Sequence, residues 1–196
     1  MDFLKQHIWL VVIAVLVALF VMNGVNIIPT QDEKVKAAWS QVDNQYQRRM
    51  DLIPNLVETV KGYANFEKST LTDVINARAS ATKVTLSPEM LSDPEAVKKF
   101  EAAQGALTNT LSRLMVVSER YPDLKANQQF LALQSQLEGT ENRIAVARRD
   151  YIDTVQQYNT TVRTFPGRIW AMIYGAQPKQ VFTSTEGADK PPSVKF

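Results

Sequence analysis

Two groups of charged and polar residues have side-chain types that could bind a ligand or carry out chemistry. Arg49, Asp51 and Asn55 fall in one segment of helical spacing, and Glu141 and Arg148 fall in another. Arg49 interrupts a stripe of apolar residues, and a buried guanidinium needs a carboxylate or carbonyl groups to offset its desolvation. Glu141 is the carboxylate that we expect to meet it. We therefore favour a structural polar network across a helical bundle over a ligand site.

The residue types on which most enzymes depend are scarce in this chain. His7 is the single histidine and cysteine is absent, which leaves no basis for a histidine-centred site, a thiolate metal site or a cysteine nucleophile. Glu-x-x-His pairs, glycine-rich phosphate loops and a G-x-S-x-G motif are also missing from the sequence. We predict no catalytic, cofactor-binding or metal-binding residues, and therefore no enzyme activity.

An uninterrupted apolar run near the amino terminus decides how the remaining elements are placed. No side chain from Ile8 to Met22 is charged or strongly polar. A helix needs roughly 20 such residues, rising about 1.5 Å each, to cross a hydrocarbon core of about 30 Å. Residues 8–28 supply that length, so we predict a transmembrane anchor over residues 1–29. The residues that define this span are Ile8, Trp9, Leu10, Phe20 and Met22.

Two other interpretations of this run fit less well. A cleaved signal peptide needs small residues after the apolar core, and residues 23–29 contain no Ala-x-Ala-like pair. A soluble helix that is apolar all round needs a large core to surround it. Within the span, Ala14 and Ala18 form a small-x-x-x-small pair that would let two helices approach closely, which favours an oligomer.

The charges on either side of the span predict its orientation. Lys5 and the free amino terminus precede it, whereas the charges at residues 32–36 cancel. By the positive-inside rule, the amino terminus faces the cytoplasm and residues 30–196 lie outside a cytoplasmic membrane. The lipid bilayer is thus one expected partner.

Composition limits the other partners and the number of domains. Lys and Arg number 22 against 20 Asp and Glu, for a formal net charge of +2, and the basic residues are spread along the chain. The basic stripe that neutralises phosphates is missing, so we exclude nucleic acid as a partner. About 165 residues remain beyond the span, which suits one domain with an ordinary core.

Apolar residues recur at helical spacing over four stretches beyond the span. The expected helices cover residues 32–66, residues from 69 to a break at 85–93, residues 94–120 and residues 123–165, the last with a seven-residue repeat. We predict an all-α fold with a single N-terminal transmembrane helix, an elongated antiparallel four-helix bundle with coiled-coil spacing over residues 30–166, and an extended C-terminal tail.

Pro54 lies inside the first of these helices and cannot donate a backbone hydrogen bond. We predict a kink there, or a short break with Asp51 capping the second half. Asn55 is a candidate to satisfy the carbonyl group that such a kink would free.

Residues 167–175 form a short segment that is dense in large apolar groups. It either docks onto another protomer or a membrane interface, or packs against the end of the bundle. Residues 176–196 are mostly polar, and we expect this tail to be disordered in an isolated protomer. The candidate docking residues are Arg168, Ile169, Trp170, Met172, Ile173 and Tyr174.

Two blocks of sequence resemble a known family. Residues 48–63, RRMDLIPNLVETVKGY, are similar to the first signature of the LemA family, and residues 121–148, which begin YPDLKAN, are similar to its second. The resemblance runs from the span to about residue 175 and leaves the tail unmatched. It implies a bacterial membrane-anchored helical bundle with a single amino-terminal span, in a family without established catalytic activity that includes relatives tied to membrane organisation.

These features together favour a non-enzymatic scaffold at a membrane. A rod-like bundle with apolar segments at both ends cannot bury those segments alone, so we expect a homo-oligomer that self-associates through its bundle and apolar termini. The alternative is a monomeric extracytoplasmic adaptor that binds another envelope protein. An enzyme or a small-ligand sensor is the third hypothesis, and we expect neither.

Overall fold

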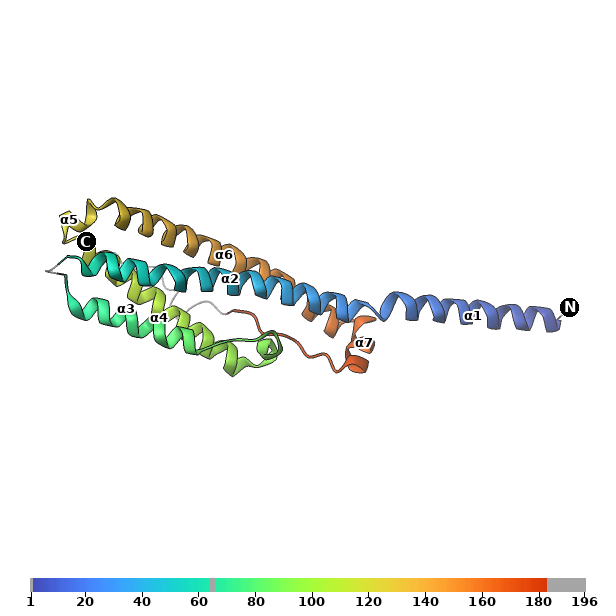
Figure 1. The fold of residues 1–196 in the computed structure, drawn as a ribbon. Coiled ribbons are helices and arrows are strands. Elements are labelled where there is room, and N and C mark those ends of the chain that lie inside the picture. Colours follow the sequence, from blue (N-terminus) through green and yellow to red (C-terminus); the bar gives the residue numbers. More distant parts are fainter. Residues whose placement is uncertain (1, 64–65, 183–196) are drawn as a thin grey trace, which may run out of the picture. The chain divides into compact units, whose positions relative to one another are not determined.

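The computed structural model describes residues 2–63 and 66–182, with side chains from residue 7 onward except at residue 23. Every regular element among these residues is helical, as predicted, and Figure 1 traces them in order. The elements are α1 (Asp2–Gly24), α2 (Ile27–Lys61), α3 (Lys68–Lys83), the 3-10 turn η1 (Pro88–Ser92), α4 (Pro94–Ser118), α5 (Pro122–Lys125), α6 (Gln128–Arg163) and α7 (Gly167–Tyr174).

The chain divides into two compact units. The first, which we call the anchor unit, comprises residues 1–49 and 139–179, and the second unit comprises residues 50–138 and 180–196. Each of the long helices α2 and α6 has one part in the first unit and one part in the second.

The core of the anchor unit is made by the predicted stripes of α2 and α6. Trp39 of α2 meets Tyr151 of α6 edge to face, with ring centroids 5.7 Å apart. Residues four and three apart fall on one side of a helix, so a regular apolar repeat buries one continuous face. The buried members of the two stripes are Val35, Trp39, Val42 and Tyr46 on α2, and Ile144, Tyr151, Val155, Tyr158 and Val162 on α6.

The second unit has its own core, in which α3 and α4 pack closely along their lengths. Asp93 caps α4 by accepting hydrogen bonds from the amides of Glu95 and Ala96, with Pro94 at the first helical position. The core residues include Ile53, Leu56, Val60, Phe66, Leu71, Val74, Leu107, Leu114, Leu124, Phe130 and Leu137.

The predicted helix over residues 123–165 is wrong at its start. The chain forms the short helix α5, breaks, and begins α6 at Gln128. Asn127 Oδ1 accepts a hydrogen bond from the amide of Phe130 at 2.9 Å, which makes Asn127 an amino-terminal cap for a new helix. The predicted break at residues 85–93 separates α3 from α4 and contains η1.

Pro54 does not break α2, which remains helical from Ile27 to Lys61. Proline leaves the carbonyl group four residues earlier, that of Met50, without its helical donor. Arg78 Nε of α3 donates to Met50 O at 3.0 Å and replaces the missing amide. The predicted short break with Asp51 as its cap is therefore not present. Asp51 and Asn55 lie exposed within the continuous helix, and the donor to the freed carbonyl group is Arg78.

The beginning of the tail is ordered, contrary to expectation. In the anchor unit, Asn159 Nδ2 donates to Lys179 O, and the amide of Lys179 donates to Asn159 Oδ1, each at 2.8 Å. In the second unit, the amide of Gln180 donates to Leu91 O at 2.8 Å, and Phe182 is buried. The part of the predicted tail beyond residue 182 lies outside the described residues.

Candidate functional site

Helix α7 folds back onto the end of α6 because glycines stand at both of its ends. Gly167 is buried, and a Cβ atom there would lie 2.2 Å from the backbone oxygen of Thr161. Gly175 ends the helix in the left-handed conformation, with φ of 62°, and lets the amide of Ala176 donate to Ala171 O at 2.8 Å. The segment is thus a closed, capped helix with a fixed position on the anchor unit.

One face of α7 packs against the junction of α1 and α2, beside which Figure 1 places it. Trp170 is 7% exposed, and its ring centroid lies 5.9 Å from that of Phe20. Tyr174 Oη donates to the carbonyl oxygen of Val25 at 2.9 Å, which satisfies a carbonyl group where the helix is interrupted. This face matches the packing alternative from the sequence, with α1 and the start of α2 as the surface.

The opposite face of α7 is apolar and exposed. Met172 is 69% exposed and Ile173 is 66% exposed, while Ile169 is 36% exposed. Phe165, just before the helix, is 77% exposed, although its ring stacks on Phe20 at a centroid distance of 6.5 Å. We call these four residues, Phe165, Ile169, Met172 and Ile173, the outer face of α7. Arg168 is exposed beside them.

The predicted span residues lie on α1, which is exposed on all sides. Trp9 is 69% exposed and Met22 is 70% exposed, and Ala14 and Ala18 are also exposed. By length and composition, one helical stretch among the described residues could cross a membrane, and its apolar window has none of its surface buried. The exposed large apolar residues of α1 are Ile8, Trp9, Leu10, Val11, Val12, Ile13, Val15, Leu16, Val17, Leu19, Phe20, Val21 and Met22.

Arg49 lies at the centre of a polar cluster inside the anchor unit. Its side chain is 1% exposed, and its Nη1 atom lies 2.8 Å from Oε1 of Glu141, the carboxylate expected to meet it. Its guanidinium carbon lies 5.1 Å from the centroid of the Tyr46 ring, a cation–π contact. Burial raises the pKa of Tyr46, while the positive charges of Arg148 and Arg49 oppose that rise.

The other two residues of the predicted network are assigned to the second unit. Asp51 and Asn55 belong to the second unit and are exposed. The cluster in the anchor unit is therefore built from one buried cation, one half-exposed carboxylate, a tyrosine and a second arginine. Such an arrangement compensates a buried charge, as a structural polar network does.

A second polar cluster, which the sequence pattern did not predict, holds the start of the tail. Lys179 Nζ lies 2.9 Å from Asp32 Oδ1 and 5.4 Å from the centroid of the Tyr158 ring. Partial burial alone would raise the pKa of Asp32, but hydrogen bonds from Lys179 and Lys36 outweigh it and lower that pKa. We call Asp32, Tyr158, Asn159 and Lys179 the tail clasp. The sequence feature that could have indicated this cluster is the adjacent pair Tyr158 and Asn159 in α6.

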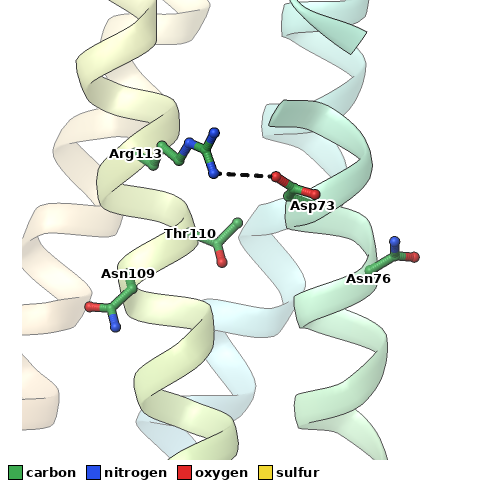
Figure 2. A pocket seen from close by; sticks show the side chains of 5 residues that line it. All are labelled: Asp73, Asn76, Asn109, Thr110 and Arg113. Atoms are coloured by element: carbon green, nitrogen blue, oxygen red, sulfur yellow. Dashed lines mark ion pairs between the residues drawn. The ribbon is translucent and has the colours of Figure 1, made fainter. Parts of the chain in front are cut away.

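A shallow polar groove of about 340 Å³ lies between α3 and α4 in the second unit. Figure 2 shows Arg113 reaching Asp73, with Nη1 3.6 Å from Oδ2, and both side chains are about half exposed or more. Exposed pairs of this kind contribute at most about 1 kcal/mol, and every side chain in the groove is accessible to water. The groove is lined by Asp73, Asn76, Asn109, Thr110 and Arg113.

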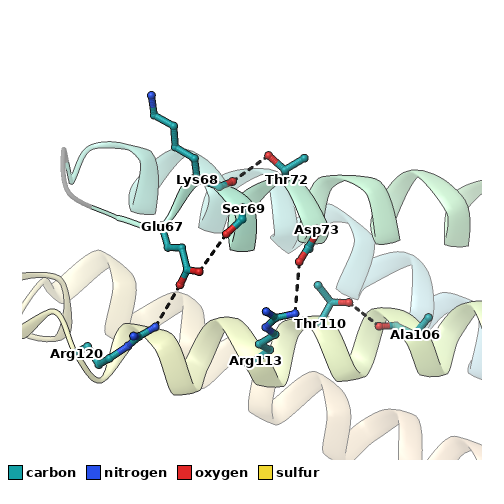
Figure 3. Close-up of polar contacts among 9 residues, drawn as sticks. All are labelled: Glu67, Lys68, Ser69, Thr72, Asp73, Ala106, Thr110, Arg113 and Arg120. Carbon is teal, nitrogen blue, oxygen red and sulfur yellow. Dashed lines mark hydrogen bonds and ion pairs between the residues drawn. The ribbon is translucent and has the colours of Figure 1, made fainter.

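The polar contacts around this groove are those of an ordinary helix pair. Figure 3 shows Glu67 joined to Arg120 at 3.2 Å and to Ser69 at 3.1 Å. Thr72 and Thr110 donate to carbonyl groups one turn earlier on their own helices. Over the part of the chain that the structure describes, no group of three or more His, Asp or Glu side chains could hold a metal ion.

Comparison with known proteins decides the family. The chain matches the LemA family over residues 38–196. It belongs to the LemA family. The match to this family continues to residue 196, beyond residue 175 where the motifs had seemed to stop, so the tail is part of it.

Among similar proteins, magnetosome protein MamQ 2 of Paramagnetospirillum magneticum (strain AMB-1) is 27% identical, over 85% of this chain and 67% of its own length. Magnetosome protein MamQ of Magnetospirillum gryphiswaldense is 26% identical over the same shares. Protein LemA of Metamycoplasma hominis is 24% identical, over 67% of this chain and 56% of its own length. The similarity to the LemA family thus extends over most of the helical part.

Proposed function

We propose that this LemA family protein is a non-enzymatic scaffold, anchored by α1 in a bacterial inner membrane. The observation that carries the proposal is the exposure of α1, whose large apolar side chains from Ile8 to Met22 are each at least 39% exposed. At about 25 cal/mol for each Å² of apolar surface in water, such a helix is stable only in lipid or against other copies.

The arrangement outside the membrane follows from the helices themselves. We propose that α2, α3, α4 and α6 form an elongated antiparallel four-helix bundle on the outer side, with the amino terminus in the cytoplasm. Continuous α2 and α6 of 35 and 36 residues supply the length, and their buried stripes supply the contact surfaces.

Self-association is the second part of the proposal. Ala14 and Ala18 lie one turn apart on the exposed surface of α1, where small side chains let two helices approach closely. Size-exclusion chromatography with light scattering in mild detergent should give a multimer for the full-length chain. A monomer at micromolar concentration, both for the full-length chain and for residues 1–175, would contradict self-association.

Paired substitutions identify the surface involved. Ala14→Ile with Ala18→Ile should reduce the multimer, because larger side chains hold the two helices apart. The matched control, Val12→Ile with Leu16→Ile, changes the other side of the same helix and should leave the multimer unchanged. Crosslinking in cells tests the adaptor alternative, since adducts with another envelope protein and none with itself would favour the adaptor.

A further inference from the structure

We propose that the outer face of α7 lies in the headgroup region of the membrane that α1 crosses, so that the protein contacts one bilayer with both a span and a surface helix. This inference rests on the proposed function, because it requires α1 to be in lipid. The occupant of the outer face is then the bilayer surface, and α7 fixes how the anchor unit is placed on it.

The contacts of α7 determine its depth. Phe20 belongs to the apolar run of the span, and its ring lies 5.9 Å from Trp170 and 6.5 Å from Phe165, measured between centroids. Tyr174 is bonded to the backbone of Val25, just after α1. Whatever environment surrounds the last turn of α1 therefore also surrounds α7.

The length of α1 shows that this environment is the edge of the bilayer. A span of roughly 20 residues that starts at Ile8 ends near residue 28. Gly24 and Val25, against which Trp170 and Tyr174 pack, come before that point. Helix α7 thus lies level with the end of the hydrocarbon core, where amphipathic helices bury their apolar face about 5–10 Å below the headgroups.

The chemistry of α7 fits this place. The outer face carries four large apolar side chains, three of which are at least 66% exposed: Phe165, Met172 and Ile173. Arg168 is exposed at the start of the helix, where its guanidinium can reach lipid phosphates. Tyrosine and tryptophan, here Tyr174 and Trp170, are the residues enriched at membrane interfaces.

A second copy of the chain is a less suitable occupant of the outer face. Three side chains on a helix of 8 residues, with Phe165 just before it, form a small patch, and a stable interface buries about 1,200 Å² or more. The outer face is also continuous with the lipid-facing surface of α1 through Phe20, which is itself 39% exposed. Lipid covers both surfaces without any further protein.

Fluorescence quenching in vesicles tests the inference on the full-length chain. The sequence contains no cysteine, so Met172→Cys and Ile173→Cys each give one labelling site for an environment-sensitive dye. Both residues are exposed, which keeps the packing of Trp170 intact. The vesicles contain phosphatidylcholine and phosphatidylglycerol, with a nitroxide attached either near the headgroup or deep in the acyl chain.

Two further sites serve as controls. Val17→Cys on α1 reports whether the span is in lipid. Val146→Cys on α6 replaces an apolar residue that is 61% exposed and lies outside the proposed membrane contact. We expect stronger quenching of the dye at residues 172 and 173 by the shallow nitroxide than by the deep one. The order should reverse at residue 17, and residue 146 should show no quenching.

Each pattern of quenching has one meaning. Quenching at residue 17 without quenching at residues 172 and 173 would overturn the inference and leave the proposed span intact. A dye at residue 172 that is shielded from water but not quenched would assign the outer face to protein and would also overturn it. Lack of quenching at residue 17 would overturn the span itself, and the inference with it.

Discussion

Trp170 packs directly on Gly24: a Cβ atom at Gly24 would lie 2.0 Å from the indole Nε1 and 2.2 Å from Cε2. Glycine inside a helix lowers its intrinsic stability by about 1 kcal/mol relative to alanine, and Gly24 is the last residue of α1. The contact explains why glycine is nonetheless suitable here. Only a residue without a side chain allows the indole ring to lie against the backbone where α1 ends.

The first prediction tests this contact through Gly24→Ala. We expect the full-length protein to lose about 1–3 kcal/mol of stability, because the added methyl group displaces the indole and loosens α7. Thermal unfolding in detergent and the rate of tryptic cleavage after Arg168 measure the two effects. Gly105→Ala is the matched control: its Cβ meets nothing within 4 Å, so it should be neutral or stabilising.

A compensating change makes this test specific. Trp170→Leu should lower the cost of Gly24→Ala in the double variant, because a smaller side chain leaves room for the methyl group. If Gly24→Ala is as stable as Gly105→Ala, then Trp170 does not depend on the glycine.

The second prediction concerns the buried cation Arg49. Glu141→Gln should cost about 2 kcal/mol, because it leaves a guanidinium that is 1% exposed without its carboxylate. Arg49→Met should cost less, since it removes the charge and retains most of the apolar stem. Chemical denaturation measures both.

An exposed pair provides the comparison for Arg49. Glu58→Gln removes the partner of Lys61 on the surface of α2, where both side chains are more than half exposed, and should change stability by less than about 0.5 kcal/mol. If Glu141→Gln is as mild as Glu58→Gln, the cluster around Arg49 is not structural, and a ligand site regains support.

The third prediction concerns the carbonyl group of Met50, which Pro54 leaves without a helical donor. Arg78→Ala should cost about 1–3 kcal/mol, because the buried oxygen then lacks its hydrogen bond. In a Pro54→Ala background the restored amide should take the place of the guanidinium, so the same substitution should cost clearly less. Equal costs in the two backgrounds would show that Arg78 acts elsewhere.

Arg113→Ala is the matched control for Arg78. Its side chain is 65% exposed and pairs with Asp73 at 3.6 Å on the surface, so its removal should change stability by less than about 0.5 kcal/mol in either background. The difference between the two arginines measures the value of the hydrogen bond to Met50.

The regular parts of this fold were predictable because they repeat. Val35, Trp39, Val42 and Tyr46 are spaced as one face of a helix, and all four are buried. Arg49 was recognisable because it interrupts that pattern, and a buried guanidinium requires a carboxylate. These conclusions depend only on the period of the helix and on the cost of burying a charge.

The missed features depend on contacts between distant parts of the chain. Pro54 indicates that one carbonyl group lacks its helical donor. Nothing near Pro54 in the sequence indicates that the replacement donor is Arg78, which lies 28 residues away from Met50. Asn159 binds the backbone of Lys179, and a backbone partner leaves no trace in composition. Trp170 packs on a glycine, and the role of that glycine is visible only when the fold has brought the indole ring against the backbone of α1.

The last prediction concerns the tail clasp and pH. The pKa of Asp32 lies below its ordinary value of 3.8 in the folded protein, because the hydrogen bonds from Lys179 and Lys36 outweigh the effect of burial. A carboxyl group with a lowered pKa stabilises the fold above its unfolded pKa, and this contribution is lost as the pH falls through the folded value. The clasp should therefore remain closed from neutral pH down to about pH 5 and open only in stronger acid.

Tryptic cleavage after Lys179 near neutral pH should be slow in the parent chain and fast in Asn159→Ala. The control is Asn109→Ala on the exposed surface of α4, which should leave cleavage unaffected. Hydrogen exchange of the Lys179 amide follows the acid transition, and opening between pH 8 and pH 5 would contradict the role given to Asp32.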